Sequence, residues 1–192
     1  MDWYSTLIGG LIGFISSIGT LIVERLLNQK GKINLYAKIV YEHQYGKNTW
    51  GFWNFEDEIA LNVPIWIEFQ NLSNSTRVMR NVNLLLYKDG NRQQELCQIN
   101  RSGDGEKKFD FANDGSYSFV IEPRSIQKYD CHFSLKQSMR IAESFDEIKL
   151  RYFDEKDKEH ILHLGSVNGN WKVGDFPRSG EWIKLKSKVK IY

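Results

Sequence analysis

The sequence predicts a mainly β protein, in which an N-terminal transmembrane α-helix precedes an antiparallel β-sandwich or barrel. First, residues 3–23 form an apolar run without a single charge. Second, from Lys32 onward the hydrophobic period changes from about 3.6 residues to about 2. Third, the alternating segments are short and are separated by turn signals such as Asp-Gly, which indicates about nine or ten antiparallel strands.

Composition predicts two parts and excludes some partners. Residues 1–30 form the predicted transmembrane helix and its juxtamembrane extension, and residues 31–192 form a cytosolic β-domain large enough for a core of its own. The formal net charge is +2, whereas a nucleic-acid-binding domain carries a larger, clustered excess, so no DNA partner is expected. Cys97 and Cys131 could form one disulfide or remain reduced, buried thiols, and a cytosolic location favours the thiols.

The apolar run is the right length for a bilayer. At about 1.5 Å per residue, residues 3–23 span roughly 30 Å, the thickness of the hydrocarbon core. A cleaved signal peptide needs a basic n-region and a small-residue cleavage site, yet no Lys or Arg precedes Arg25 and the first alanine is Ala37. A buried core helix is the other alternative. We expect an uncleaved membrane anchor in contact with lipid.

Charges around the run predict its orientation. Asp2 precedes it, and four basic residues follow it: Arg25, Lys30, Lys32 and Lys38. The positive-inside rule then places a short N-terminal tail outside and the β-domain in the cytoplasm. The helix is expected to continue through Leu27 and to end near Gly31, which can act as a C-terminal cap.

Small residues share one face of the predicted helix. At about 100° per residue, this face contains Gly9, Gly13, Ser16 and Thr20, while bulky aliphatic residues occupy the other side. Small residues let two helix backbones approach closely, and Gly9-x-x-x-Gly13 is one such motif. Small residues are also common in membrane helices without any such role. We expect this helix to self-associate into a homo-oligomer.

The strand pattern continues to the end of the chain. The nine or ten expected strands are drawn from eleven alternating segments, at residues 32–42, 59–71, 82–91, 92–99, 107–112, 116–122, 125–135, 147–153, 160–167, 170–173 and 181–192. The Asp89-Gly90 and Asp114-Gly115 pairs predict hairpin turns. A charged turn covers residues 154–159, and one short helix is expected within residues 136–144.

Two stretches resemble immunoglobulin-like sandwiches. In "IWIEFQNLSNSTRVMRNVNLLLYKDG" (residues 65–90), an apolar strand ends at an asparagine, a polar loop follows, and a second strand returns. "VIEPRSIQKYDCHFSL" (residues 120–135) is similar to segments of the same domains. The resemblance implies a fold and carries no functional residues.

No arrangement of chemical groups predicts catalysis. His160 and His163 are three residues apart, and Cys131 and His132 are adjacent, so on a strand each pair points to opposite faces. The sequence contains no GxxxxGK[ST], HExxH or GxSxG motif. We expect neither an enzyme nor a bound metal or cofactor.

Two segments are candidate binding surfaces. Four aromatic residues fall within six positions of a predicted loop: Trp50, Phe52, Trp53 and Phe55. They either cover one end of the sandwich or contact a ligand or partner. Near the C-terminus, a basic face is predicted from Lys184, Lys186, Lys188 and Lys190, which alternate with the apolar Ile183, Leu185 and Val189. These lysines either protect an edge strand or face anionic lipid or a small anionic ligand.

The predicted architecture favours a membrane-anchored sensor or effector, whose β-domain binds a ligand or protein partner while the helices cluster. It resembles bacterial antiphage membrane effectors, which join an N-terminal membrane segment to a small β-barrel that binds a cyclic nucleotide. Those proteins typically have two membrane spans, and this chain has one. The resemblance implies a role in antiviral defence. The alternative is a passive tether or adaptor, in which the sandwich binds another protein and the helix only localises it.

Overall fold

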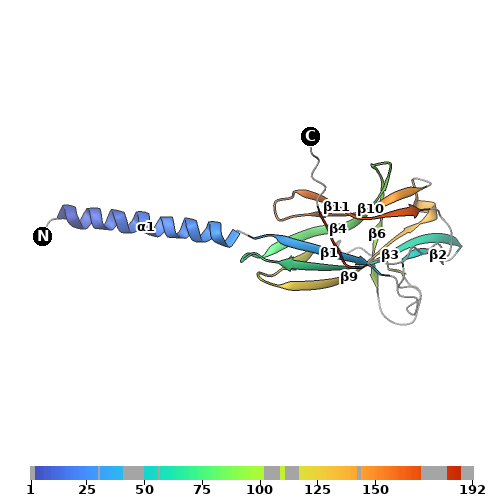
Figure 1. Ribbon diagram of the computed structural model, residues 1–192, viewed down its shortest axis with the longest axis horizontal. Coiled ribbons are helices and arrows are strands. Elements are labelled where there is room, and N and C mark those ends of the chain that lie inside the picture. Colours follow the sequence, from blue (N-terminus) through green and yellow to red (C-terminus); the bar gives the residue numbers. More distant parts are fainter. Residues whose placement is uncertain are drawn as a thin grey trace.

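An isolated helix joined to a two-sheet domain makes up the computed structural model, which describes residues 3–29, 31–40, 50–55, 57–101, 109–110, 117–141, 144–169 and 181–186. Helix α1 (Trp3–Gln29) projects from one end of the domain, roughly along its long axis (Figure 1). Its span from Thr6 to Leu26 is long and apolar enough to cross a membrane, and none of that span is buried against the domain.

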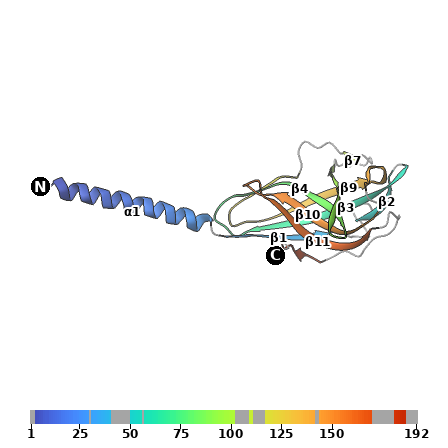
Figure 2. The same ribbon diagram turned by 90° about the horizontal axis from the view of Figure 1, so that it is seen from above.

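Two antiparallel sheets form the domain (Figures 1 and 2). The seven-stranded sheet has the order β12-β1-β3-β9-β6-β7, with β2 also paired to β3. Its strands are β1 (Ile33–Ile39), β2 (Gly51–Phe55), β3 (Glu58–Asn71), β6 (Cys97–Arg101), β7 (Phe109–Asp110), β9 (Ile126–Lys136) and β12 (Ile183–Lys184). The five-stranded sheet has the order β11-β10-β4-β5, with β8 also paired to β4. Its strands are β4 (Arg77–Lys88), β5 (Asn91–Glu95), β8 (Phe119–Ile121), β10 (Phe145–Phe153) and β11 (Glu159–Gly169).

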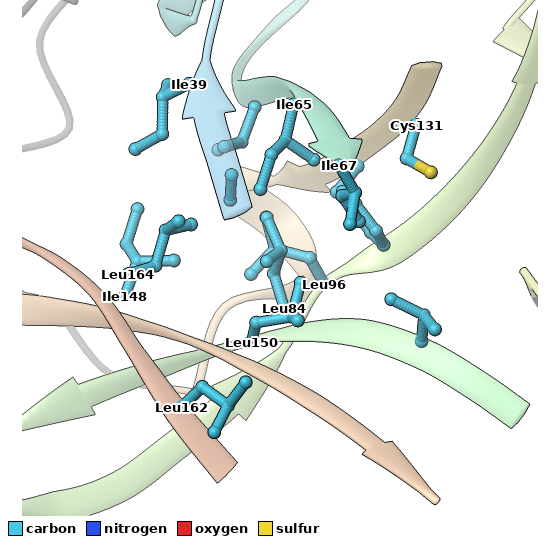
Figure 3. Packing of buried hydrophobic residues seen from close by; sticks show 14 of the residues in the cluster. Ile39, Ile65, Ile67, Leu84, Leu96, Cys131, Ile148, Leu150, Leu162 and Leu164 are labelled. Carbon is cyan, nitrogen blue, oxygen red and sulfur yellow. The ribbon is translucent and has the colours of Figure 1, made fainter. Parts of the chain in front are cut away.

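The core lies between the two sheets. Alternate residues of each strand point inward, as the two-residue period requires, so Ile65 and Ile67 of β3 face Leu84 of β4 and Leu150 of β10 (Figure 3). Neither sheet closes on itself within the described residues. Of the two predicted forms, the sandwich is therefore confirmed.

Two local predictions are wrong. The sequence predicts a loop for the aromatic segment at residues 49–58, yet β2 pairs with β3 as a tight hairpin. Gly51 lies opposite Asn62 at the open end of the hairpin, and Phe55 lies opposite Glu58 next to its turn. The predicted strand at residues 92–99 is two strands in different sheets, β5 beside β4 and β6 beside β9. They separate at Leu96, whose side chain is buried in the core where the chain crosses between sheets.

Other predictions are adjusted or lie outside the described residues. Strands β7 and β8 do not pair with each other as a hairpin, because β7 pairs with β6 and β8 with β4. The expected helix at residues 136–144 is reduced to the 3₁₀ turn η2 (Gln137–Met139). The Asp114-Gly115 turn, the strand at residues 170–173 and residues 187–192 of the last strand lie outside the described residues.

Candidate functional site

The small face of α1 is open along its length. A Cβ placed on Gly9 or Gly13 would meet no heavy atom within 4 Å. Inside the helix, the Ser17 hydroxyl donates to the Gly13 carbonyl at 2.8 Å and the Thr20 hydroxyl donates to the Ser16 carbonyl at 2.9 Å. Because the hydroxyl hydrogens of Ser17 and Thr20 are already used, neither is left to donate to a neighbouring helix, and contact at Gly9 and Gly13 would depend on close packing.

The aromatic segment is divided between the core and the surface. Trp50 is only 3% exposed and Phe52 only 2%, and both belong to the core between the sheets. Of the two alternatives for this segment, packing therefore holds for Trp50 and Phe52, since the β2–β3 hairpin turns them inward. Trp53 is half-buried, and the side chain of Phe55 lies outside the described residues.

The predicted basic face is present in part. Lys184 and Lys186 are exposed on either side of the buried Leu185, whose N–H donates to the Leu35 carbonyl at 2.8 Å. Strand β12 is only two residues long, and it pairs with Tyr36 and Ala37 of β1. Lys188 and Lys190 lie outside the described residues.

Lys184 belongs to a larger surface on the outer face of the seven-stranded sheet. We call this surface the lysine–tryptophan face, and its residues come from β1, β3, β9 and the β12 segment: Tyr36, Lys38, Trp66, Lys128, Trp182 and Lys184. The Lys128 ammonium lies 4.1 Å from the Trp66 ring centre and 5.9 Å from that of Trp182. The two indole centres are 6.4 Å apart, so one cation is shared by two aromatic rings.

Acidic neighbours limit the positive potential of this face. In the register of β3 and β9, Glu68 lies opposite Lys128, and Asp130 lies opposite Trp66. The remaining ammonium groups lie at the ring faces, with Lys38 at 5.3 Å from Trp66 and Lys184 at 5.5 Å from Tyr36. Together these groups provide flat aromatic surface bordered by cations, an arrangement that suits an anionic ligand or an acidic protein segment.

Histidines and cysteines are held apart as the strand argument expected. His160 Nε2 lies 2.7 Å from Asp154 Oδ2 and its ring stacks on Tyr152, whereas His163 contacts Glu147 on another part of the sheet.

Neither cysteine forms a disulfide. Burial raises the pKa of both the Cys131 and the Cys97 thiol, which opposes the thiolate form. Within the described residues, no three His, Cys, Asp or Glu side chains are placed to hold a metal ion.

A compact junction joins α1 to the sandwich. Gly31 has a φ of +137°, and a Cβ at this position would lie 2.5 Å from the Ser73 Cα. The next residue, Lys32, accepts a hydrogen bond from the Leu72 N–H at 3.1 Å. Only glycine permits this approach, so the chain leaving α1 lies directly against the loop between β3 and β4.

Asn71 is the centre of the junction. Its buried amide nitrogen donates to the carbonyls of Ser75 and Glu122 at 2.9 Å and of Ile121 at 3.3 Å. Its Oδ1 accepts from the Ser73 N–H at 3.0 Å and from the Ser73 hydroxyl at 2.6 Å. One side chain thereby ties the β3–β4 loop to the β8–β9 turn. We call this part of the sandwich the junction end; it comprises residues 31–32, 71–76 and 121–126.

The sequence did not predict the lysine–tryptophan face beyond Lys184, nor the junction. Trp66 could have been noted as a tryptophan on the polar face of an alternating strand. Its contact with Trp182 depends on a pairing between the first and last strands that no local pattern reveals. No family model matches this chain, and comparison with curated proteins finds no match either.

Proposed function

We propose that this chain is a single-pass membrane-anchored sensor or effector. In this proposal, α1 spans the bilayer, the N-terminus lies outside, and the sandwich lies in the cytoplasm and binds an anionic ligand or a protein partner. The main support for this proposal is that the span from Thr6 to Leu26 has no packing partner in the domain. So much apolar surface is stable only against lipid or against another helix.

The flanking charges support the proposed orientation. Glu24 and Arg25 end the uncharged run, and Lys32 follows at the junction with the sandwich. Basic residues are retained on the cytoplasmic side during insertion. The opposite orientation would require the whole sandwich to be translocated.

The small face of α1 is the surface through which we propose that copies of the chain associate. Replacing Gly9 and Gly13 by leucine should reduce self-association, since bulky side chains keep the two backbones apart. The same change leaves the monomer intact, because both positions are open. Crosslinking of the full chain in bilayers or a two-hybrid assay for membrane helices measures this association.

Gly10 provides the matched control. It is equally open, since a Cβ at this position would also meet no heavy atom within 4 Å, and it lies about 100° around the helix from Gly9. G10L should therefore associate like the parent chain. Equal oligomer populations in G9L/G13L, G10L and the parent would remove the basis for an effector whose helices cluster.

The lysine–tryptophan face is the proposed binding surface of the sandwich. Its shared Lys128 cation and two indole rings supply charge and flat apolar area together. Ligand binding here that alters helix clustering fits a sensor and, by architectural resemblance, antiphage defence. Binding of a protein with no effect on clustering fits the alternative, a passive tether or adaptor. Crosslinking before and after partner addition separates these two functions.

A further inference from the structure

The junction end is the part of the sandwich that would lie nearest to a membrane crossed by α1. Both views show α1 leaving this end along the long axis of the domain, so the β3–β4 loop and the β8–β9 turn lie nearest to the helix (Figures 1 and 2). The hydrogen bond from Leu72 to Lys32 and the close approach of Gly31 to Ser73 keep the loop beside the helix exit.

Chain length limits how far this end can be from lipid. The apolar span ends at Leu26, and the helix adds about 4.5 Å to Gln29. Two further residues reach Gly31 and add at most about 7 Å. The headgroup layer is about 5–8 Å thick on each side of the hydrocarbon. Ser73, which Gly31 touches, is therefore within or next to the headgroups.

The side chains at this end suit that environment. Leu72 is 46% exposed although it is apolar. Lys32 and Arg124 are exposed beside it, and Arg124 Nε donates to Asn74 Oδ1 at 2.6 Å, which holds its side chain over the loop. Glu122 is a carboxylate on the same turn. An apolar side chain flanked by long basic ones is typical of segments that lie in a membrane interface.

We propose that the junction end rests on the cytoplasmic leaflet, with Leu72 among the lipid headgroups and with Lys32 and Arg124 on lipid phosphates. This inference rests on the proposed function, because it requires α1 to span the bilayer. It adds an orientation: the sandwich stands on its junction end, and the lysine–tryptophan face is directed sideways, where a soluble ligand reaches it.

Fluorescence at a single labelled cysteine tests this contact. L72C is made in a C97S background and labelled with an environment-sensitive fluorophore; Cys131 is buried, and burial raises the pKa of its thiol, so it reacts slowly. The full chain is placed in vesicles of phosphatidylcholine and phosphatidylglycerol, with and without lipids spin-labelled at the headgroup. We expect a blue shift and quenching by the spin label.

Ile141 provides the matched site at the far end. It is 81% exposed and follows η2, and β9 separates it from the junction end by about 33 Å at 3.3 Å per residue. Label at I141C should be unquenched. Equal quenching at both sites, or at neither, in a chain that resists carbonate extraction overturns the inference and leaves α1 as a spanning helix. Release of the chain by carbonate overturns the proposed function, and the inference with it.

A charge variant separates the phosphate contact from the apolar one. R124Q should lose part of the quenching at position 72 in phosphatidylglycerol vesicles and none in pure phosphatidylcholine. K88Q removes a cation from the other end of β4 and should leave the quenching unchanged. Identical quenching of R124Q and the parent in both vesicles overturns the assignment of Arg124 to lipid phosphate.

Discussion

Gly31 is a single residue on which the attachment of the helix depends. G31A should destabilise the protein by two effects: the positive φ costs about 1 kcal/mol for a non-glycine residue, and the clash with Ser73 costs a further ~1–3 kcal/mol. The clash is with backbone atoms, at 2.5 Å from Cα and 2.8 Å from N, so a side-chain rotation does not relieve it. Urea unfolding of the full chain in detergent, followed by tryptophan emission, measures the loss.

Gly90 separates the two effects. Its φ is +79°, and a Cβ there would meet no heavy atom within 4 Å. G90A should therefore show the cost of φ alone. If G31A unfolds at the same urea concentration as G90A, the close approach to Ser73 contributes nothing to stability.

Asp154 should make the β10–β11 turn sensitive to acid. Burial opposes its charged form, but hydrogen bonds from His160 and from the backbone N–H groups of Lys158 and Lys156 outweigh burial and hold the pKa of Asp154 at about 2, below the usual 3.8. A lowered pKa means that ionised Asp154 stabilises the fold fully above about pH 4, and that this contribution is lost as the pH falls toward 2.

Amide hydrogen exchange at Lys158 measures this effect. Protection in the parent chain should fall between pH 4 and 2 after correction for the intrinsic rate, and D154N should show no such step because its side chain has no titrating carboxyl. The same step in D154N would assign the acid response to another group.

The sequence predicted the direction of single side chains where this depends on spacing along one strand. It did not predict contacts between residues that are far apart in the chain. The opposite directions of His160 and His163 followed from the two-residue period. The role of Gly31 was predicted only as a helix cap, since its contact with Ser73 depends on how the β3–β4 loop folds back. Three of the five side-chain hydrogen bonds of Asn71 stay within the loop that follows it, whereas those to Ile121 and Glu122 reach 50 and 51 positions away. No local pattern indicates these two.

At the scale of elements, the short strand β12 is followed by one apolar side chain that is buried in the core. Leu185 is buried in the core cluster, while Ile183 in the same segment is exposed. L185A should lower the free energy of unfolding by about 2–4 kcal/mol and increase hydrogen exchange at the N–H of residue 185, which donates to the Leu35 carbonyl. I183A should change stability by less than about 0.5 kcal/mol. Equal effects of the two would mean that burial of Leu185 does not hold this segment to the domain.

Long alternating strands were the elements best predicted from sequence. Residues 59–71, 125–135 and 147–153 correspond to β3, β9 and β10 within two residues at each end. The segment at residues 49–58 was assigned to a loop, whose aromatics would either cover one end of the sandwich or contact a ligand, and the structure turns Trp50 and Phe52 into the core. The break at Leu96 was not predicted, because the residues of β5 and those of β6 both alternate as strand residues do. The two strands are distinguished only by the sheets to which they belong.

For the whole molecule, the sandwich should fold without α1. The core cluster consists of residues from the two sheets and their connections, and the span from Thr6 to Leu26 buries nothing against it. A chain beginning at Gly31 should be soluble without detergent, show a β-type circular dichroism spectrum, and unfold cooperatively. Non-cooperative melting of this chain would show that the helix is part of the folding unit.

The choice between sandwich and barrel could not be made from the sequence. Both forms need the same strands and the same alternation, and they differ only in which edge strands pair. Here β11 and β5 end one sheet, and β12 and β7 end the path through the other. Those edges are set by pairings such as β1 with β12, which join opposite ends of the chain.

The junction also has a mechanical consequence. Because Gly31 and Lys32 are held against the Leu72–Ser73 turn, we expect rotation of α1 about its own axis to turn the sandwich with it. Each residue inserted between the apolar span and Gly31 would turn the two parts relative to each other by about 100°. In the homo-oligomer that we propose, the angle at which two small faces meet would then determine which sheets of two neighbouring sandwiches face each other, and this would couple helix register to domain pairing.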